Sequence, residues 1–159
     1  MLKLKNVPEE LRSAIYEKGY DKLTTVQSLV LNSSNSGKDL LVSSQTGSGK
    51  TLAYGLSISS DGLEEMIDQY NKLRTLIVTP TRELALQVFN ELAWLFSKTS
   101  ITISTAIGGM DIKKERKNIE KGVDLLIGTP GRINDHIRRK TFDLNNIKSL
   151  VLDEADEML

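Results

Sequence analysis

The sequence predicts an α/β fold in which helices flank a parallel β-sheet. Short runs rich in Leu, Ile and Val alternate along the chain with segments of helical periodicity. Apolar runs of this length, bounded by Gly, Pro, Ser or Asp, are typical of strands buried on both faces. Their alternation with helices implies parallel strands joined by right-handed crossovers. In such sheets, ligands bind at the carboxyl ends of the strands.

The predicted strands are five apolar runs in chain order. They lie at residues 40–43, 76–78, 101–103, 125–127 and 150–152. Polar or glycine-containing stretches at residues 32–37 and 57–62 are expected to be turns or loops.

The predicted helices fall between these strands. They lie at residues 82–98, 111–121 and 132–140. Apolar side chains recur about four residues apart in the first and the third, and the second ends before Gly122. Trp94 is expected to pack beside the apolar stripe of the first of these helices, which runs from Val88 to Leu95. His136 is expected on an exposed helix.

Composition limits the classes of function. A chain of 159 residues with 39% hydrophobic and 26% charged residues describes one domain with a buried core. The 21 basic and 21 acidic residues cancel, so any nucleic-acid site must concentrate its positive charge locally. The absence of cysteine and the single His136 exclude a disulfide framework, a thiolate metal site and a histidine cluster. No apolar run approaches the roughly 20 residues of a membrane span, and we expect a cytoplasmic protein with no membrane partner.

The strongest chemical signal is the stretch from Ser44 to Thr51, directly after the first predicted strand. Gly47 and Gly49 permit backbone conformations that direct several N–H groups at one anion, and a helix follows with the positive end of its dipole. In this pattern Lys50 reaches the β- and γ-phosphates of a nucleotide, and Thr51 binds Mg²⁺. A glycine-rich turn that merely caps a helix is the alternative, which the strand–loop–helix context disfavours. The residues of the predicted phosphate-binding loop are Thr46, Gly47, Ser48, Gly49, Lys50 and Thr51.

The second signal is the apolar run at residues 150–152, which ends in Asp153, Glu154 and Asp156. Burying such carboxylates without a cation is costly. At the strand end, Asp153 is placed to hold Mg²⁺ through water, and Glu154 is placed to orient and deprotonate an attacking water. Alone, this cluster would more often be a solvated loop or a helix cap; together with the phosphate-binding loop it predicts nucleotide hydrolysis.

The chain resembles the DEAD-box ATP-dependent RNA helicases, and most closely their bacterial DeaD-type branch. Asp153-Glu154-Ala155-Asp156 is the sequence that gives this family its name. The other motifs are present in order: a Q motif at residues 19–27, Pro80-Thr81-Arg82-Glu83-Leu84-Ala85, Gly108-Gly109, and Thr129-Pro130-Gly131-Arg132. The resemblance implies a three-layer, RecA-like P-loop fold, with ATP and Mg²⁺ as cofactors and RNA as partner. Residues 1–159 would form part of the first RecA-like domain, with the Q-motif region at residues 2–28.

The Q motif has two interpretations. Thr24 and Gln27 match a capping box, in which each side chain binds the other residue's backbone N–H. The resemblance instead assigns the Gln27 amide to the adenine edge, where one donor and one acceptor can select adenine over guanine. Leu2 stands where the family carries a phenylalanine that stacks on adenine, so stacking is left open.

The resemblance also implies contacts to RNA. Hydroxyls, backbone N–H groups and arginines can bind a ribose–phosphate backbone without reading bases. The alternative makes the threonines helix caps and the arginines surface charges. The basic clusters at residues 113–117 and 138–140 are expected to be solvated helix faces. The implied RNA contacts are Thr81, Arg82, Gly109, Thr129 and Arg132.

The sequence ends at Leu159, where the family continues with a further strand and a second RecA-like domain. The resemblance implies that this domain acts in cis, that Asp156 couples the two domains, and that the missing arginine fingers supply about 10³- to 10⁵-fold in rate. We therefore expect this chain to bind nucleotide weakly and not to unwind RNA. Without the further strand, the two strands at residues 40–43 and 150–151 are expected to flank a gap about one strand wide. Two alternatives stay open: a regulatory nucleotide- or RNA-binding module without turnover, and a P-loop ATPase acting on DNA or protein.

Overall fold

The computed structural model describes residues 7–32, 37–60 and 72–159. These residues form two compact units. The first contains the chain up to Glu64 together with Glu91–Ser100, and the second contains Glu65–Asn90 and Ile101–Leu159. Helix α5 (Arg82–Leu95) begins in the second unit and ends in the first. Each unit has its own buried apolar residues.

The first unit is built from helices α1 (Glu9–Glu17), α2 (Thr25–Val30) and α3 (Lys50–Ser60). Helix α1 ends in a Schellman motif at Gly19, whose φ is 82°. There the N–H of Tyr20 donates to the carbonyl of Ile15 at 3.2 Å, and that of Gly19 donates to Tyr16 at 2.9 Å. The core consists of apolar side chains that are almost fully buried, namely Leu11, Ile15, Leu52, Leu56, Leu92 and Leu95.

Two predictions for this unit are wrong. Residues 40–43 form no strand, and Leu41 is 101% exposed. An apolar run becomes a strand only where a neighbouring backbone pairs with it, and no described strand pairs with this one. Residues 57–60 extend α3 instead of forming a loop, whereas residues 61 and 62 lie outside the described part of the chain. Most of the predicted turn at residues 32–37 also lies outside it.

Trp94 lies on the α5 segment of the first unit. Its ring stacks on Tyr20, with the centroids 6.0 Å apart and the planes 11° from parallel. The Lys18 ammonium lies 5.4 Å from the centre of the Trp94 ring, within the range of a cation–π interaction. The tryptophan therefore joins the end of α1 to α5 within this unit.

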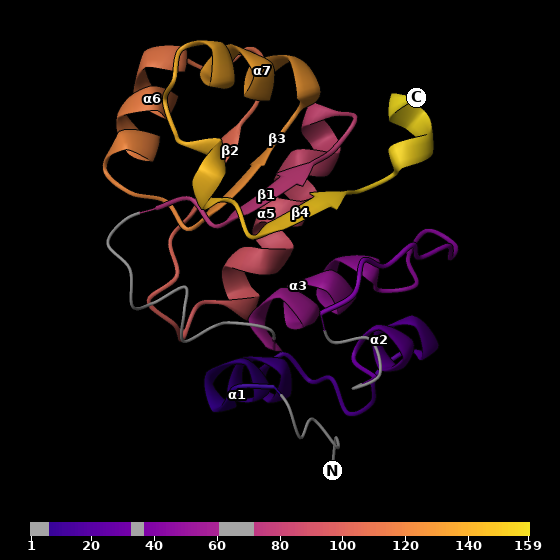
Figure 1. The fold of residues 1–159 in the computed structure, drawn as a ribbon. Helices are drawn as coiled ribbons and strands as arrows, with labels where there is room; N and C mark the ends of the chain where they lie inside the picture. Colours follow the sequence, from indigo (N-terminus) through magenta and orange to yellow (C-terminus); the bar gives the residue numbers. More distant parts are fainter. Residues whose placement is uncertain (1–6, 33–36, 61–71) are drawn as a thin grey trace. The chain divides into compact units, whose positions relative to one another are not determined.

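The second unit contains a parallel sheet, as the sequence predicts. Its strands are β1 (Thr75–Val78), β2 (Ile103–Ala106), β3 (Leu125–Gly128) and β4 (Ser149–Leu152), in the order β2-β3-β1-β4 (Figure 1). All three described pairings are parallel. Four of the five predicted strands are thus present, and the prediction for β2 lies too early in the chain. The Thr102 N–H donates to the carboxylate of Asp124 at 2.7 Å. The pairing of β2 with β3 therefore starts one residue later, at Ile103 and Leu125.

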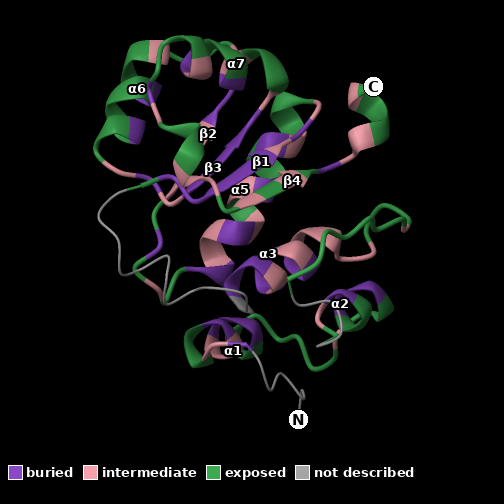
Figure 2. Cartoon of the chain, viewed as in Figure 1, coloured by how far each residue is buried: buried purple, intermediate pink, exposed green. Residues whose placement is uncertain are grey.

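Helices cover the sheet because its strands are apolar on both sides. Leu76, Ala106 and Leu126 pack with Ile119 of α6 (Ile112–Glu120) and Ile133 of α7 (Pro130–Arg138). On the other side, Ile77, Leu125 and Ile127 are fully buried. Strand β4 differs, since Leu150 and Leu152 are 59% and 55% exposed. The contrast between the buried central strands and β4 is visible in Figure 2.

The helices of this unit begin and end close to the predicted positions. Asp111 caps α6, where its carboxylate accepts from the Lys113 N–H at 2.9 Å. Helix α7 ends two residues earlier than predicted, at Arg138. Lys140 adopts a φ of 54° there, and the N–H groups of Thr141 and Lys140 donate to His136 and Ile137 at 3.0 Å each. This is again a Schellman motif, with lysine in the position that glycine usually takes.

Two short 3₁₀ helices, η2 (Leu144–Asn146) and η3 (Ala155–Met158), flank β4. None of the helices in the described part of the chain is long and apolar enough to span a membrane.

Candidate functional site

The carboxyl edge of the sheet carries the predicted motifs of the second unit. The strand ends are level, because Val78 pairs with Gly128 and Leu152, and Ala106 pairs with Gly128. Backbone hydrogen bonds then extend the ladder by one residue beyond three strands. They run from Thr79 to Gly128 at 2.9 Å, from Thr129 to Ala106 at 3.1 Å, and from Asp153 to Val78 at 2.9 Å. The sheet therefore fixes the first residue of each loop and brings these loops to one edge.

The two threonines of the predicted RNA contacts differ. The Thr81 hydroxyl accepts from the Leu84 N–H at 3.2 Å, so it caps the first turn of α5. Thr129 is the N-cap residue of α7, but its side chain makes no capping hydrogen bond. The capping interpretation therefore holds for Thr81 and not for Thr129. The Thr81 hydroxyl still has a hydrogen to donate.

Arg82 and Gly109 lie against each other. Gly109 has a φ of 83°, and a Cβ at this position would lie 2.5 Å from Nη1 of Arg82. The left-handed backbone is what favours glycine here, because the exposed guanidinium could shift to admit a side chain. Arg82 is exposed, and none of the salt bridges among the described residues includes it. Its charge is therefore available at the turn.

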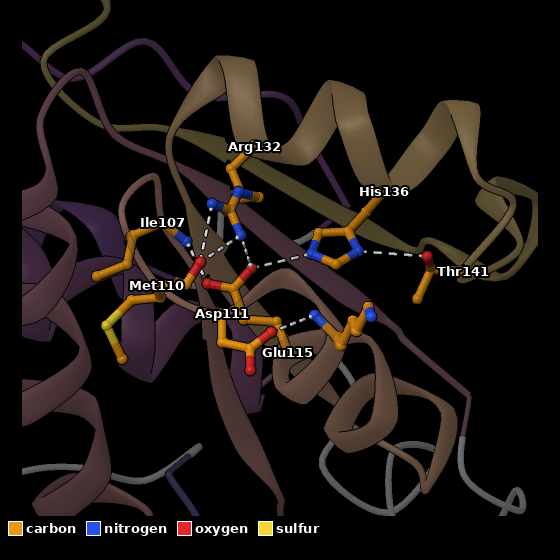
Figure 3. A network of polar contacts seen from close by, with 8 residues as sticks. Ile107, Met110, Asp111, Glu115, Arg132, His136 and Thr141 are labelled. Atoms are coloured by element: carbon orange, nitrogen blue, oxygen red, sulfur yellow. Dashed lines mark hydrogen bonds and ion pairs between the residues drawn. The ribbon is translucent and has the colours of Figure 1, made fainter.

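Arg132 is placed differently. Its Nη1 donates to Oε2 of Glu115 at 2.8 Å, and Nη1 and Nη2 both donate to the Met110 carbonyl at 3.1 Å (Figure 3). The side chains of Arg132 and Glu115 are only 11% and 8% exposed. The structure thus brings Arg132 to the same edge as Arg82 but pairs it with a buried carboxylate.

The prediction that His136 lies on an exposed surface is wrong. The residue is fully buried, with Nε2 3.1 Å from Oε2 of Glu115 and Nδ1 3.2 Å from the Thr141 hydroxyl. Burial is possible because both ring nitrogens have partners. The prediction failed because the partner carboxylate lies 21 residues away in the sequence.

Glu115 and His136 are the residues that sequence reasoning missed. Glu115 occupies the apolar stripe of α6 between Ile112 and Ile119, and His136 lies three residues after the buried Ile133 on α7. Polar side chains at stripe positions are costly to bury unless they are paired. That conflict is the signal that could have identified them. By contrast, the basic residues predicted to be solvated are exposed: Lys113, Lys114, Arg116, Lys117, Arg138, Arg139 and Lys140.

The acidic motif follows β4. Asp153 is buried, at 8% exposure, and its backbone is fixed by the hydrogen bond to Val78. Glu154 has a φ of 50° and a ψ of 49°, in the left-handed region that non-glycine residues seldom adopt. Its side chain makes no capping bond to η3, which leaves the carboxylate untied to that helix. Asp156 lies in η3 and is exposed.

The predicted phosphate-binding loop belongs to the first unit. Gly47 and Gly49 have φ values of 75° and 86°, as an anion-binding backbone requires. Lys50 begins α3, and its ammonium donates to the carbonyl of Ser44 at 2.8 Å. Ser44 and Ser48 close the loop with a hydrogen bond of 2.8 Å between their hydroxyls. Lys50 and Thr51 thus stand at the first turn of a helix whose N-terminal N–H groups favour anions.

Gln27 contacts this loop. The capping box predicted from sequence is present: Oε1 of Gln27 accepts from the Thr24 N–H at 2.9 Å, and the Thr24 hydroxyl accepts from the Gln27 N–H at 3.4 Å. In addition, Nε2 donates to the Gly49 carbonyl at 3.2 Å. A Cβ on Gly49 would lie 2.4 Å from this nitrogen, so Gly49 is also needed for space. Leu2, the counterpart of the family's stacking phenylalanine, lies outside the described residues.

The residues present fit a nucleotide with a hard divalent cation. The loop supplies left-handed glycines, a helix N-terminus and an ammonium, which suit phosphate oxygens. Thr51, beside this loop, offers a hydroxyl oxygen, a ligand type that Mg²⁺ takes together with substrate phosphates and water. The described residues contain no group of three or more His, Cys, Asp or Glu that could hold a metal ion.

Comparisons with known proteins identify a family and several relatives. A protein-family profile described as DEAD/DEAH box helicase matches residues 24–159. The chain is 40% identical over 151 residues to the ATP-dependent RNA helicase CshA of Limosilactobacillus reuteri, a match that covers 95% of this chain and 30% of the relative. It is 41% identical over 162 residues to the ATP-dependent RNA helicase HAS1 of Chaetomium globosum, covering 97% of this chain and 26% of the relative.

A solved structure is also similar. The DEAD box protein from the hyperthermophile Methanococcus jannaschii matches with a TM-score of 0.84 and 37% sequence identity, covering 96% of this chain and 41% of that chain. The chain therefore spans less than half of this structure, and 26% to 30% of the two curated relatives.

Proposed function

Because the chain belongs to the DEAD/DEAH box helicase family, we propose that it is the ATP-binding lobe of an RNA helicase. The whole protein would couple ATP binding and hydrolysis to the remodelling of RNA duplexes. This chain alone would bind nucleotide weakly and would not unwind, because a second RecA-like domain supplies the arginine fingers. The observation that carries the proposal is the loop from Ser44 to Thr51, with two left-handed glycines and Lys50 at a helix N-terminus.

The nucleotide-binding residues act on two parts of ATP. The loop backbone faces the phosphates, through Thr46, Gly47, Ser48 and Gly49. When a nucleotide binds, the Lys50 ammonium gives up its hydrogen bond to the Ser44 carbonyl and binds phosphate oxygens instead. That exchange replaces a neutral acceptor with a charged one. Gln27 recognises adenine through the donor and acceptor of its amide.

Glu154 and Asp153 serve the hydrolysis step, in which water attacks the γ-phosphorus and the bond to the leaving oxygen breaks. Glu154 follows β4 with a left-handed backbone and makes no capping bond to η3, and its carboxylate would orient the water and accept its proton. Thr51 and Asp153 would hold Mg²⁺, Asp153 through water. When bound, the ion offsets the negative charge of the phosphates.

The RNA contacts lie at the carboxyl edge of the sheet. Arg82 and Gly109 adjoin there, and Thr81 and Thr129 begin the neighbouring helices α5 and α7. These groups can bind a sugar–phosphate backbone without reading base sequence. Asp156 is exposed on η3, where it can couple this lobe to the second domain. A cytoplasmic location would suit this partner.

Isothermal titration calorimetry with ATP or ADP and Mg²⁺ tests the proposal. Lys50→Ala removes the ammonium that balances phosphate charge, and we expect affinity to fall at least about tenfold, as for the loss of a charge-assisted hydrogen bond. Lys38→Ala is the matched control, since Lys38 is exposed in the same unit and lies outside the loop. Unchanged affinity in a folded Lys50→Ala protein would refute the phosphate-binding role.

A further inference from the structure

Ser44 is the residue at which this loop departs from the general phosphate-binding pattern. In that pattern a first glycine stands five residues before the glycine that precedes the lysine. Counting back from Gly49 and Lys50 places the first glycine at residue 44, which is a serine in this chain. Ser44 therefore adds a hydroxyl that the general loop lacks.

This extra hydroxyl binds another side chain of the loop. It forms a hydrogen bond with the Ser48 hydroxyl, and the two oxygens are 2.8 Å apart. Both serines are half-buried. Because glycine has no side chain, the general loop cannot form this bond. The bond joins Ser44 to Ser48 around residues 45–47.

The segment enclosed by this bond contains a turn. The Ser48 N–H donates to the Gln45 carbonyl at 3.3 Å, and Gly47, the third residue of the turn, has a φ of 75°. To point at an anion together with the other N–H groups of the loop, the Ser48 N–H has to leave the Gln45 carbonyl. The hydroxyl bond opposes this change, because it holds together the segment that must open.

The backbone of Ser44 binds a further group that is meant for phosphate. The Lys50 ammonium donates to the Ser44 carbonyl at 2.8 Å. The Lys50 ammonium, the Ser48 N–H and the Ser48 hydroxyl thus all have partners inside the loop. Ser44 provides two of these three partners. Nucleotide phosphates therefore compete with the loop's own hydrogen bonds.

The hydroxyl bond does not hold the loop ready for phosphate. In the arrangement that the bond stabilises, Lys50 and the Ser48 N–H both face neutral carbonyl oxygens. Phosphate binding requires both donors to face the anion instead. A bond that stabilises this internally bonded arrangement consequently works against the nucleotide.

We propose that the Ser44 hydroxyl is a positioning group that lowers nucleotide affinity by holding the loop in its internally bonded arrangement. The net contribution of one hydrogen bond corresponds to about a fivefold change in affinity. This inference rests on the proposed function, since it concerns how the same loop accepts the phosphates of ATP or ADP. Ser44 would thus adjust nucleotide affinity without itself binding a phosphate.

Isothermal titration calorimetry with ADP and Mg²⁺ tests the effect on affinity. Ser44→Ala removes the hydroxyl and keeps the carbonyl that binds Lys50, so ADP should bind about fivefold more tightly. Ser43→Ala is the matched control, because Ser43 is the exposed serine just before the loop, and its affinity should equal that of the wild type. An affinity of Ser44→Ala that equals the wild-type value or falls below it overturns the proposal.

A double-mutant cycle tests whether the gain comes from the bond between the two hydroxyls. In a Ser48→Ala background the bond is already absent, so adding Ser44→Ala should change ADP affinity by less than twofold. If Ser44→Ala produces the same gain in both backgrounds, the two hydroxyls act independently and the proposal fails.

Amide hydrogen exchange of the nucleotide-free protein, followed by NMR, tests the positioning role without measuring binding. The Ser48 N–H is bonded inside the turn, so loosening the turn in Ser44→Ala should make this amide exchange about fivefold faster. Ser43→Ala should exchange at the wild-type rate. Equal exchange at Ser48 in Ser44→Ala and Ser43→Ala contradicts the positioning role.

The calorimetry also distinguishes this inference from the proposed function. If neither the wild type nor Ser44→Ala binds ADP, the proposed nucleotide site is wrong and the inference falls with it. If the wild type binds ADP, Lys50→Ala weakens binding and Ser44→Ala gains nothing, the nucleotide site stands and only the role of Ser44 is refuted.

Discussion

At the scale of single residues, Gln27 serves two interactions through one amide. Its oxygen accepts from Thr24 and its nitrogen donates to Gly49. An amide oxygen has two lone pairs and an amide nitrogen has two hydrogens, so each atom keeps one position for a ligand. The capping box and adenine recognition therefore do not exclude each other. One amide can thus serve the helix start and the nucleotide contact that we propose.

Gln27→Ala should lower both stability and nucleotide selectivity. Loss of the capping box and of the Gly49 contact should cost about 1–2 kcal/mol of unfolding free energy. ATP should compete better than GTP in the wild type, and this preference should shrink in the variant. Thermal unfolding and competition against a fluorescent nucleotide measure the two effects, with the exposed Ser28→Ala as control. Equal ATP and GTP binding in both proteins would leave capping as the complete role of Gln27.

Glu115→Ala tests the buried ion pair at the same scale. The substitution leaves the Arg132 guanidinium without its carboxylate, and the N–H groups of Ile107 and His136 without an acceptor. Removing one partner of a buried pair typically costs about 3–5 kcal/mol. Urea unfolding should show this loss, whereas Glu120→Ala should change stability by at most about 0.5 kcal/mol. A small effect of Glu115→Ala would mean that water replaces the carboxylate without cost.

At the scale of secondary structure, apolar periodicity predicts most of the helices and strands of the described chain correctly. The strands at β1, β3 and β4 and the helices α5, α6 and α7 all appear within a few residues of the predicted bounds. Residues 40–43 have the same apolar character but form no strand, because strand formation also depends on a paired backbone. Periodicity cannot report such a partner.

In the candidate site, too, the features set by short segments were predictable and those set by long-range contacts were not. Local motifs predicted the glycine-containing loop before α3 and the capping box, since glycine spacing and a helix N-terminus are properties of short segments. The difference between Arg82 and Arg132 could not be predicted, because it depends on Glu115, which lies 17 residues from Arg132. Long-range pairing of polar groups is fixed only when the helices pack.

The end of α7 supplies a prediction for one element. Lys140 lies in the left-handed region with a φ of 54°, where a side chain is strained. Lys140→Gly should stabilise the protein by about 0.5–1 kcal/mol after the greater flexibility of glycine in the unfolded chain is offset. For a chain of this size, that corresponds to a rise in Tm of roughly 1–4 °C. The exposed Lys114→Gly, inside α6, is the control and should destabilise by about 1 kcal/mol. A lower Tm for Lys140→Gly would show that the lysine side chain has a favourable role.

At the scale of the whole molecule, the two units should differ in local stability. The central strand β3 is fully buried and paired on both sides, whereas residues 40–43 are exposed and unpaired with any described strand. Amide exchange should therefore be slowest at Leu126 and Ile127 and fast at Leu41 and Val42. NMR or mass spectrometry measures the difference. Equal protection of both segments would mean that residues 40–43 form a strand in solution, as the sequence alone predicts.

The edge strand β4 bears on how the chain behaves at high concentration. In the described sheet β4 pairs only with β1, and its other side presents backbone N–H and C=O groups next to the exposed Leu150 and Leu152. Such an edge is a template onto which another chain can add. The formal net charge is zero and the isoelectric point is about 6.6, so little electrostatic repulsion keeps copies apart near neutral pH. Self-association through this edge should consequently be strongest near that pH and should recede in more alkaline buffers, where the chain gains negative charge.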